Sequence, residues 1–278
     1  MHLAKKIATQ EIAALIIILT FMICLILPHF PGVPVLNYHR IDDAAYNALA
    51  LSSAEFDKQM AYLHQEGYTA ITPDQLIDYL EHRKPLPPNP ILITFDDGYE
   101  DNYQIAYPIL RKYHFTATIF LITDFVGNNG RYLNWKQVEE MRKNGFYFES
   151  HSLNHILLTE ASDENVRSQL AKSKEAIEWR LGQKVDYLAY PKGEYNQRII
   201  ALARQAGYRA AFTVNFGRDA EHCELFTLNR IPVFKGDNSF LHFWLRLKFT
   251  HVISTLQNFK AFLQKREVPL IARLIYIP

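Results

Sequence analysis

Residues 91–98, ILITFDDG, place two adjacent carboxylates, Asp96 and Asp97, directly after an apolar run. The run at 91–95 has the length and branching of a buried strand, and Gly98 marks where it turns into a loop. Because successive side chains of a strand point to opposite faces, both carboxylates can face one site only if the chain turns there. In parallel α/β folds chemistry is found at the carboxyl ends of strands. The segment therefore predicts such a fold, with a site for a cation and a proton at this strand end.

Strand-like and helix-like stretches alternate along the middle of the chain. The expected strands are 33–38, 91–95, 117–122, 147–150, 186–190 and 210–214, and the expected helices 102–113, 135–143, 163–181 and 197–206. Repeated strand-then-helix order implies parallel strands joined by helical crossovers. About seven such units favour a distorted, TIM-like (β/α) barrel over an open sheet. A chain of 278 residues with 49% hydrophobic content fits one such domain.

Two further helices are expected before the strand at 91–95. Ser52 and Glu55 form the spacing of a capping box, and residues 72–75, TPDQ, place a proline in a first turn. The proline-rich block 84–90 reads as a surface loop, because proline cannot continue a helix or a central strand.

The N-terminus indicates export. Lys5 and Lys6 precede the uncharged, apolar run 12–27, and no A-x-A-like cleavage site follows. We expect residues 1–32 to be an uncleaved signal anchor or transmembrane segment, with a cleaved signal peptide and a buried core helix as alternatives. The two lysines favour a cytoplasmic N-terminus. The chain after the anchor is therefore expected outside the cytoplasm, on the cell membrane or, if the signal is cleaved, secreted.

Residues 33–238 are the expected catalytic domain, and residues 239–278 a basic, apolar, helical tail. Between residues 240 and 278 six lysines and arginines face a single acid, Glu267. This tail can lie on an anionic membrane surface or pack on the barrel with a solvated basic face. The formal net charge of +1 gives no reason to expect nucleic acid as a partner, and we expect a monomer.

The best candidates for metal binding are Asp97, His151 and His155. The histidines are four residues apart and follow the strand expected at 147–150, so they too lie at a strand end. One carboxylate and two imidazoles leave coordination positions open, as in catalytic zinc sites. Each signal alone is weak, but their joint placement at two strand ends favours a zinc hydrolase acting on an amide or ester.

These residues resemble the motifs of the NodB-type polysaccharide deacetylases, carbohydrate esterase family 4. Residues 94–98, TFDDG, are similar to the first motif, which implies that Asp96 is the general base and Asp97 a metal ligand. Residues 151–155, HSLNH, are similar to the second, with both His151 and His155 as ligands.

The third motif of this family is resembled by residues 189–193, AYPKG. By that resemblance Tyr190 and Lys192 wall the substrate groove, and the Lys192 backbone N–H faces the oxyanion. Ala189 departs from the family, which usually has an arginine here that tethers the base. Arg230 is a candidate replacement at the groove, and a surface or structural role for it is the alternative. Lys192 replaces an aromatic residue, so the resemblance implies no aromatic sugar platform there.

Residues 35–39, VLNYH, resemble the N-terminal element of the circularly permuted branch that deacetylates poly-N-acetylglucosamine in biofilms. The resemblance implies that His39 is the general acid, the alternative being an exposed loop histidine.

Together the motifs imply a Zn²⁺-dependent hydrolase that removes N-acetyl groups from poly-N-acetylglucosamine or peptidoglycan and releases acetate. An O-acetyl esterase and a non-catalytic glycan-binding protein remain alternatives. A glycosidase needs two carboxylates on opposite sides of the scissile bond, which the adjacent Asp96 and Asp97 fit poorly.

Overall fold

The computed structural model describes residues 32–44, 48–128, 130–235 and 239–265. It divides into two units. One, Gly32–Thr250, contains the barrel, and the described part of the other is essentially helix α9 (Thr250–Lys265). The expected anchor lies outside the described residues except for Gly32, as does the end of the basic tail. No helix within the described part of the chain has the length and hydropathy to cross a membrane.

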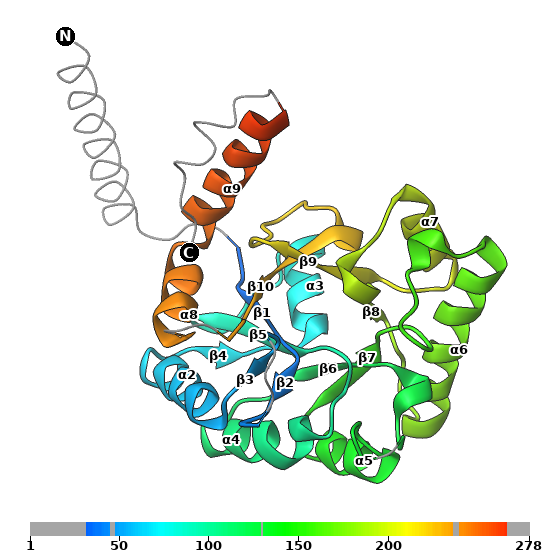
Figure 1. Cartoon of the computed structure of the whole chain (residues 1–278), viewed down its shortest axis with the longest axis horizontal. Helices are drawn as coiled ribbons and strands as arrows, with labels where there is room; N and C mark the ends of the chain where they lie inside the picture. Colours follow the sequence, from blue (N-terminus) through cyan, green and yellow to red (C-terminus); the bar gives the residue numbers. More distant parts are fainter. Residues whose placement is uncertain (1–31, 45–47, 129, 236–238, 266–278) are drawn as a thin grey trace. The chain divides into compact units, whose positions relative to one another are not determined.

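Within the described residues, seven parallel strands close into a barrel surrounded by helices (Figure 1). Their order around the ring is β1 (Val35–Tyr38), β10 (Leu228–Pro232), β9 (Ala210–Phe216), β8 (Tyr187–Ala189), β7 (Tyr147–Ser150), β6 (Thr118–Leu121) and β5 (Pro90–Phe95). The ring closes where β1 pairs with β5, with Val35 opposite Leu92 and Tyr38 opposite Phe95. Strand β4 (Thr69–Ala70) adds to β5, and β2 (Arg40–Ile41) pairs with β3 (Ala50–Leu51). The predicted (β/α) barrel is confirmed.

The helices of the barrel unit begin and end close to the residues that the sequence predicts. They are α2 (Ser53–Gln65), α3 (Pro73–His82), α4 (Tyr107–Lys112), α5 (Trp135–Lys143), α6 (Asp163–Leu181), α7 (Gln197–Gln205) and α8 (Ser239–Lys248). Ser52 caps α2 by accepting the Glu55 N–H, and Thr72 forms a capping box with Gln75. Gly182 ends α6 with a left-handed φ of 59°.

The helix expected at 102–113 differs from the prediction in its first turns. Asn102–Ala106 is π-helical, and the Tyr107 N–H bonds to the Asn102 carbonyl. Pro108 explains the change, because it has no N–H and its ring crowds the carbonyl four residues earlier in an α-helix. The wide turn places the Asn102 side chain 2.9 Å from the His39 carbonyl, which it hydrogen-bonds.

Side chains alternate between the inside of the barrel and the layer under the helices. Leu92 belongs to the inner core, while Ile91 and Ile93 belong to the outer one. Helix α3 supplies Leu76 and Ile77 to the inner core. Side chains of a strand alternate, so residues 92, 94 and 96 share the inward face. The direction of β5 therefore places the Asp96 carboxylate in the barrel mouth.

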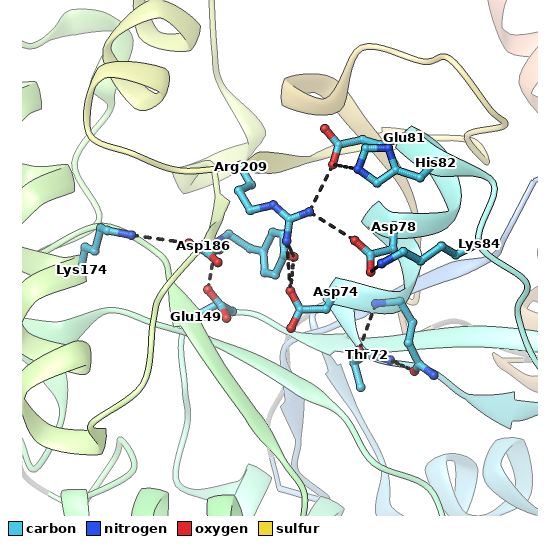
Figure 2. Close-up of polar contacts among 12 residues, drawn as sticks. Thr72, Asp74, Asp78, Glu81, His82, Lys84, Glu149, Lys174, Asp186 and Arg209 are labelled. Atoms are coloured by element: carbon cyan, nitrogen blue, oxygen red, sulfur yellow. Dashed lines mark hydrogen bonds and ion pairs between the residues drawn. The ribbon is translucent and has the colours of Figure 1, made fainter.

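Polar contacts also attach α3 to the strands (Figure 2). Arg209, just before β9, lies 3.4 Å from Asp74, 3.4 Å from Asp78 and 3.2 Å from Glu81 on α3. The Tyr187 hydroxyl of β8 donates to Asp74 at 2.5 Å. One arginine thus bridges three acids of a helix that the inner core also holds in place.

Candidate functional site

The Asp96–Asp97 pair lies where β5 ends in a sharp turn. Asp97 and Gly98 have left-handed φ values of 72° and 73°. A side chain at position 98 would place its Cβ 2.6 Å from Leu121 Cδ2, and the positive φ would strain it, so glycine is favoured there. The turn predicted from strand alternation is present, and it brings both carboxylates to the same place.

The three expected metal ligands form one cluster. Asp97 Oδ1 is 3.5 Å from His151 Nε2 and 3.5 Å from His155 Nε2, and the candidate ligand atoms all lie within 4.8 Å of one another. His151 follows β7 directly, and a loop carries His155 back through left-handed φ values at Ser152 and His155. Thus the second motif forms a loop around the cluster.

The protonation states of the cluster suit a divalent cation. His151 Nδ1 lies 2.8 Å from the Ala189 carbonyl and can only donate to it, so Nε2 is left as a lone-pair donor toward Asp97. Burial lowers the pKa of His151 to about 3, lowers the pKa of His155, and raises the pKa of Asp97 to about 6. Neutral imidazoles beside one carboxylate make a donor set that fits Zn²⁺.

Asp96 is held by a buried, two-pronged ion pair. Arg230 Nη1 and Nη2 donate to its two carboxylate oxygens at 2.7 Å each, and Asn37 Nδ2 donates to Oδ2 at 3.0 Å. Burial alone would raise the pKa of Asp96, but Arg230 and the nearby histidines outweigh it and hold that pKa well below its usual range. Although Ala189 lacks a side chain that could reach the carboxylate, Arg230 from β10 occupies the tethering position.

His39 lies across from the base. Its Nε2 is 4.0 Å from Asp96 Oδ2. Its Nδ1 is buried and has no hydrogen-bond partner among the described residues. Placed directly after β1, the imidazole faces the same space as Asp96, where it can exchange a proton with a ligand.

The expected groove residues take different positions. Lys192 is exposed and has a left-handed φ of 57°. Burial is the main cause of the lowered pKa of His155, and the charge of Lys192 lowers that pKa further. Tyr190 is fully buried, and its hydroxyl donates to the Phe226 carbonyl. Arg230 is also fully buried. Tyr190 and Arg230 thus bond to other groups of the protein and Lys192 lies at the surface, and the substrate contacts expected of these three residues stay predictions.

Two contacts of the site were missed by sequence reasoning. Asn37 bonds the base, and a polar residue within the apolar run 35–38 was the available signal. The Tyr99 hydroxyl interacts with the Asp97 carboxyl and favours its ionised form. Nothing in the sequence near Tyr99 indicated this contact, because it depends on how the turn after Gly98 folds.

Comparisons with known proteins identify the family of this chain. A family model described as polysaccharide deacetylase matches residues 83–211. The Bacillus subtilis (strain 168) protein YxkH is 35% identical over 203 residues, 73% of this chain and 72% of its own length. The poly-β-1,6-N-acetyl-D-glucosamine N-deacetylase of Staphylococcus aureus is 27% identical over 234 residues, covering 74% of this chain and 80% of that protein.

Solved structures with the same fold include a deacetylase. The Streptococcus pyogenes deacetylase PplD in complex with acetate superposes with a TM-score of 0.70 at 31% identity, over 74% of this chain and 94% of that one. IcaB from Ammonifex degensii superposes with a TM-score of 0.69 at 28% identity, over 76% and 95% of the respective chains.

Proposed function

Because the chain belongs to the polysaccharide deacetylase family, we propose that it is a metal-dependent hydrolase that removes N-acetyl groups from an N-acetylglucosamine-containing polysaccharide and releases acetate. The observation that carries the proposal is the Asp96–Arg230 ion pair beside the metal-ligand cluster. It joins an ionised base to a set of donors for a cation in one barrel mouth.

Asp97, His151 and His155 would hold the cation, which we assign as Zn²⁺ from the donor set. When bound, this ion supplies polarisation of the acetyl oxygen and a lower pKa for water. The residues themselves contribute fixed positions. The Ala189 carbonyl sets the tautomer of His151, and Tyr99 favours the ionised form of the Asp97 carboxyl.

Asp96 is the proposed general base. Its low pKa keeps it ionised at neutral pH, and the Arg230 fork fixes the direction of its oxygens. Asp96 takes a proton from the attacking water as the water oxygen bonds to the acetyl carbon. Two further groups then act on the tetrahedral addition product. The backbone N–H of Lys192 faces the developing oxyanion, and His39 protonates the nitrogen as the C–N bond breaks. Acetate leaves, and the sugar keeps a free amine.

The substrate proposal rests on the relatives and on the motifs. The Staphylococcus aureus relative is named for poly-β-1,6-N-acetyl-D-glucosamine, and this polymer and peptidoglycan are the two substrates we propose to test. Both carry N-acetylglucosamine, whose acetamide presents the carbonyl and nitrogen that the proposed chemistry needs.

We propose further that the barrel acts outside the cytoplasm while attached to the cell membrane. The support is in the sequence alone: Lys5 and Lys6 before the apolar run 12–27, and the basic, apolar tail from residue 239. Fractionation of cells that produce the full chain, followed by protease treatment of intact cells, tests this placement. A cytosolic, protease-protected protein would contradict it.

Acetate release and free-amine formation on β-1,6-linked N-acetylglucosamine oligomers and on peptidoglycan test the activity. Asp96→Asn should lose at least about a hundredfold in kcat while remaining folded, because an amide cannot accept the proton. Glu164→Gln is the matched control, since it makes the same chemical change at an exposed position of α6.

The products separate the alternatives. Acetate from an O-acetylated polymer without free amine would identify an esterase, and new reducing ends without acetate a glycosidase. Binding without any product would identify a glycan-binding protein. An active Asp96→Asn enzyme would remove Asp96 from the role of base.

A further inference from the structure

A pair of stacked tyrosines borders the metal-ligand cluster. Tyr99 follows the turn that carries Asp97, and its ring lies 5.1 Å from that of Tyr132 at an interplanar angle of 17°. Phe125 packs on Tyr132 at 5.0 Å. All three rings are partly exposed, so they form an aromatic ledge (Phe125, Tyr99 and Tyr132) at the mouth of the site.

Backbone hydrogen bonds tie this aromatic ledge to the Asp97 turn. The Leu133 N–H donates to the Gly98 carbonyl at 2.9 Å, and the Glu100 N–H donates to the Arg131 carbonyl at 3.0 Å. Tyr99 and Tyr132 therefore pair as an antiparallel bridge. Residue 131 is held in a fixed position relative to the proposed ligand Asp97, although the two are far apart in sequence.

In the part of the chain that the structure describes, two arginines contact the ledge, and they differ in their partners. Arg40 lies 5.1 Å from the Tyr99 ring centre and is paired with Asp42 at 2.5 Å and Asp101 at 2.9 Å. Arg131 is exposed, and among the described residues it forms no ion pair with a carboxylate.

The guanidinium of Arg131 lies against the tyrosine pair. It lies 5.9 Å from the centres of both the Tyr99 and Tyr132 rings, which is within cation–π range. Burial raises the pKa of Tyr99, with Asp97 adding to the rise and Arg131 opposing it. Arg131 therefore contacts the ring of Tyr99, the residue two positions after Asp97 in the sequence.

We propose that Arg131 is an anion subsite and that the substrate is an acidic glycan, with a carboxylate on a sugar next to the one that loses its acetyl group. The proposal rests on the deacetylation proposed above. A guanidinium binds a carboxylate through two parallel N–H donors, and prior fixation on the ledge lowers the entropy lost on binding. A neutral glycan makes no use of this charge.

The simplest competing explanation is that Arg131 only stabilises the tyrosine pair. In that case its loss changes every substrate alike. A subsite for an anion instead affects only the acidic substrate, and the effect weakens as salt screens the charge.

Matched oligomers test the proposal. One is a peptidoglycan-derived oligomer with free carboxylates on alternate sugars, and the other is the same oligomer with those carboxylates reduced to alcohols. A third, with a phosphate on the neighbouring sugar, distinguishes carboxylate from general anion binding. We expect the wild type to prefer the carboxylate form. Arg131→Gln should raise its KM about fivefold with kcat unchanged and leave the reduced oligomer unaffected. Arg131→Lys should keep part of the preference, and Lys136→Gln, at a nearby exposed cation, should keep all of it.

Equal KM for both oligomers in the wild type, or equal loss on both in Arg131→Gln, overturns the proposal. Calorimetric binding of the oligomers to Asp96→Asn gives a readout that needs no turnover. If the wild type releases no acetate from any oligomer, the proposed function fails. Preferential, Arg131-dependent binding of the carboxylate form then still supports the subsite, and its absence overturns it.

Discussion

At the scale of single residues, the site depends on how two neighbouring carboxylates are made different. Arg230 and Asn37 bond Asp96 and hold its pKa well below the usual range. Asp97 receives no such pair, so burial raises its pKa to about 6 in the metal-free protein. One carboxylate is therefore kept as an ion by the protein, and the other gains most from a cation.

Arg230→Met is expected to destabilise the fold and impair catalysis together. The change leaves the Asp96 carboxylate buried without its partner, which costs about 3–5 kcal/mol in unfolding free energy. Urea unfolding and kcat on the same preparation measure both effects. The double variant Asp96→Asn/Arg230→Met should recover much of the stability but no activity, because no unpaired charge remains. An Arg230→Met protein as stable and active as wild type would show that the ion pair has no role.

His39→Gln is expected to lower kcat by about 10²–10⁴ with little change in KM, since an amide near Asp96 cannot donate the proton that the leaving amine needs. His64→Gln, at an exposed position on α2, is the matched control. A kcat within threefold of wild type would assign the proton to another donor.

At the scale of elements, Asp96, His39 and His151 each directly follow a strand end, so most of the site could be predicted from where the strands stop, whereas Arg230 lies within β10. The turn after β5 and the histidine loop after β7 were recognised from residue type and spacing. From the sequence, Arg230 is only a candidate partner of Asp96, because the two residues are 134 positions apart. Their contact requires that β10 and β5 lie on either side of β1, which the sequence does not reveal. The Tyr99–Tyr132 bridge could not be predicted from the sequence, because an isolated bridge leaves no periodic pattern of side chains.

Glu149 on β7 should make stability depend on pH. Its carboxyl is buried and accepts the Tyr187 N–H at 2.9 Å, and burial raises its pKa well above 4.5. The folded state then keeps a proton that the unfolded state has lost, so stability falls as pH rises from about 4.5 toward the folded pKa. The loss is about 1.4 kcal/mol per pH unit in that window. Glu149→Gln should remove this slope in urea unfolding between pH 5 and pH 8, and an unchanged slope would contradict the assignment.

At the scale of the whole molecule, barrel closure brings together residues that are far apart in the sequence, because both His39 and Arg230 lie beside Asp96. The β1–β5 pairing places His39 opposite Asp96. The sequence predicted the barrel from the alternation of elements, but closure through β1 needed the register, which depends on tertiary packing. The position of His39 relative to Asp96 therefore depends on the β1–β5 pairing.

Zinc is expected to stabilise the full chain against heat. Binding to the folded state alone contributes about 2.7 kcal/mol at a zinc concentration 100 times Kd, which raises Tm by about 5–10 °C for a domain of this size. Calorimetry of chelated and zinc-loaded protein measures this shift. His155→Gln should lose most of it, because one of three ligands is removed. An equal shift in this variant would mean that zinc binds elsewhere.

The central claim, that the Asp97, His151 and His155 cluster supports deacetylation beside Asp96, is tested most directly by acetate release from N-acetylglucosamine oligomers before chelation, after it, and after zinc is restored. We predict that chelation abolishes release and that zinc restores it in the wild type but not in Asp97→Asn. Undiminished release of acetate after chelation would contradict the account.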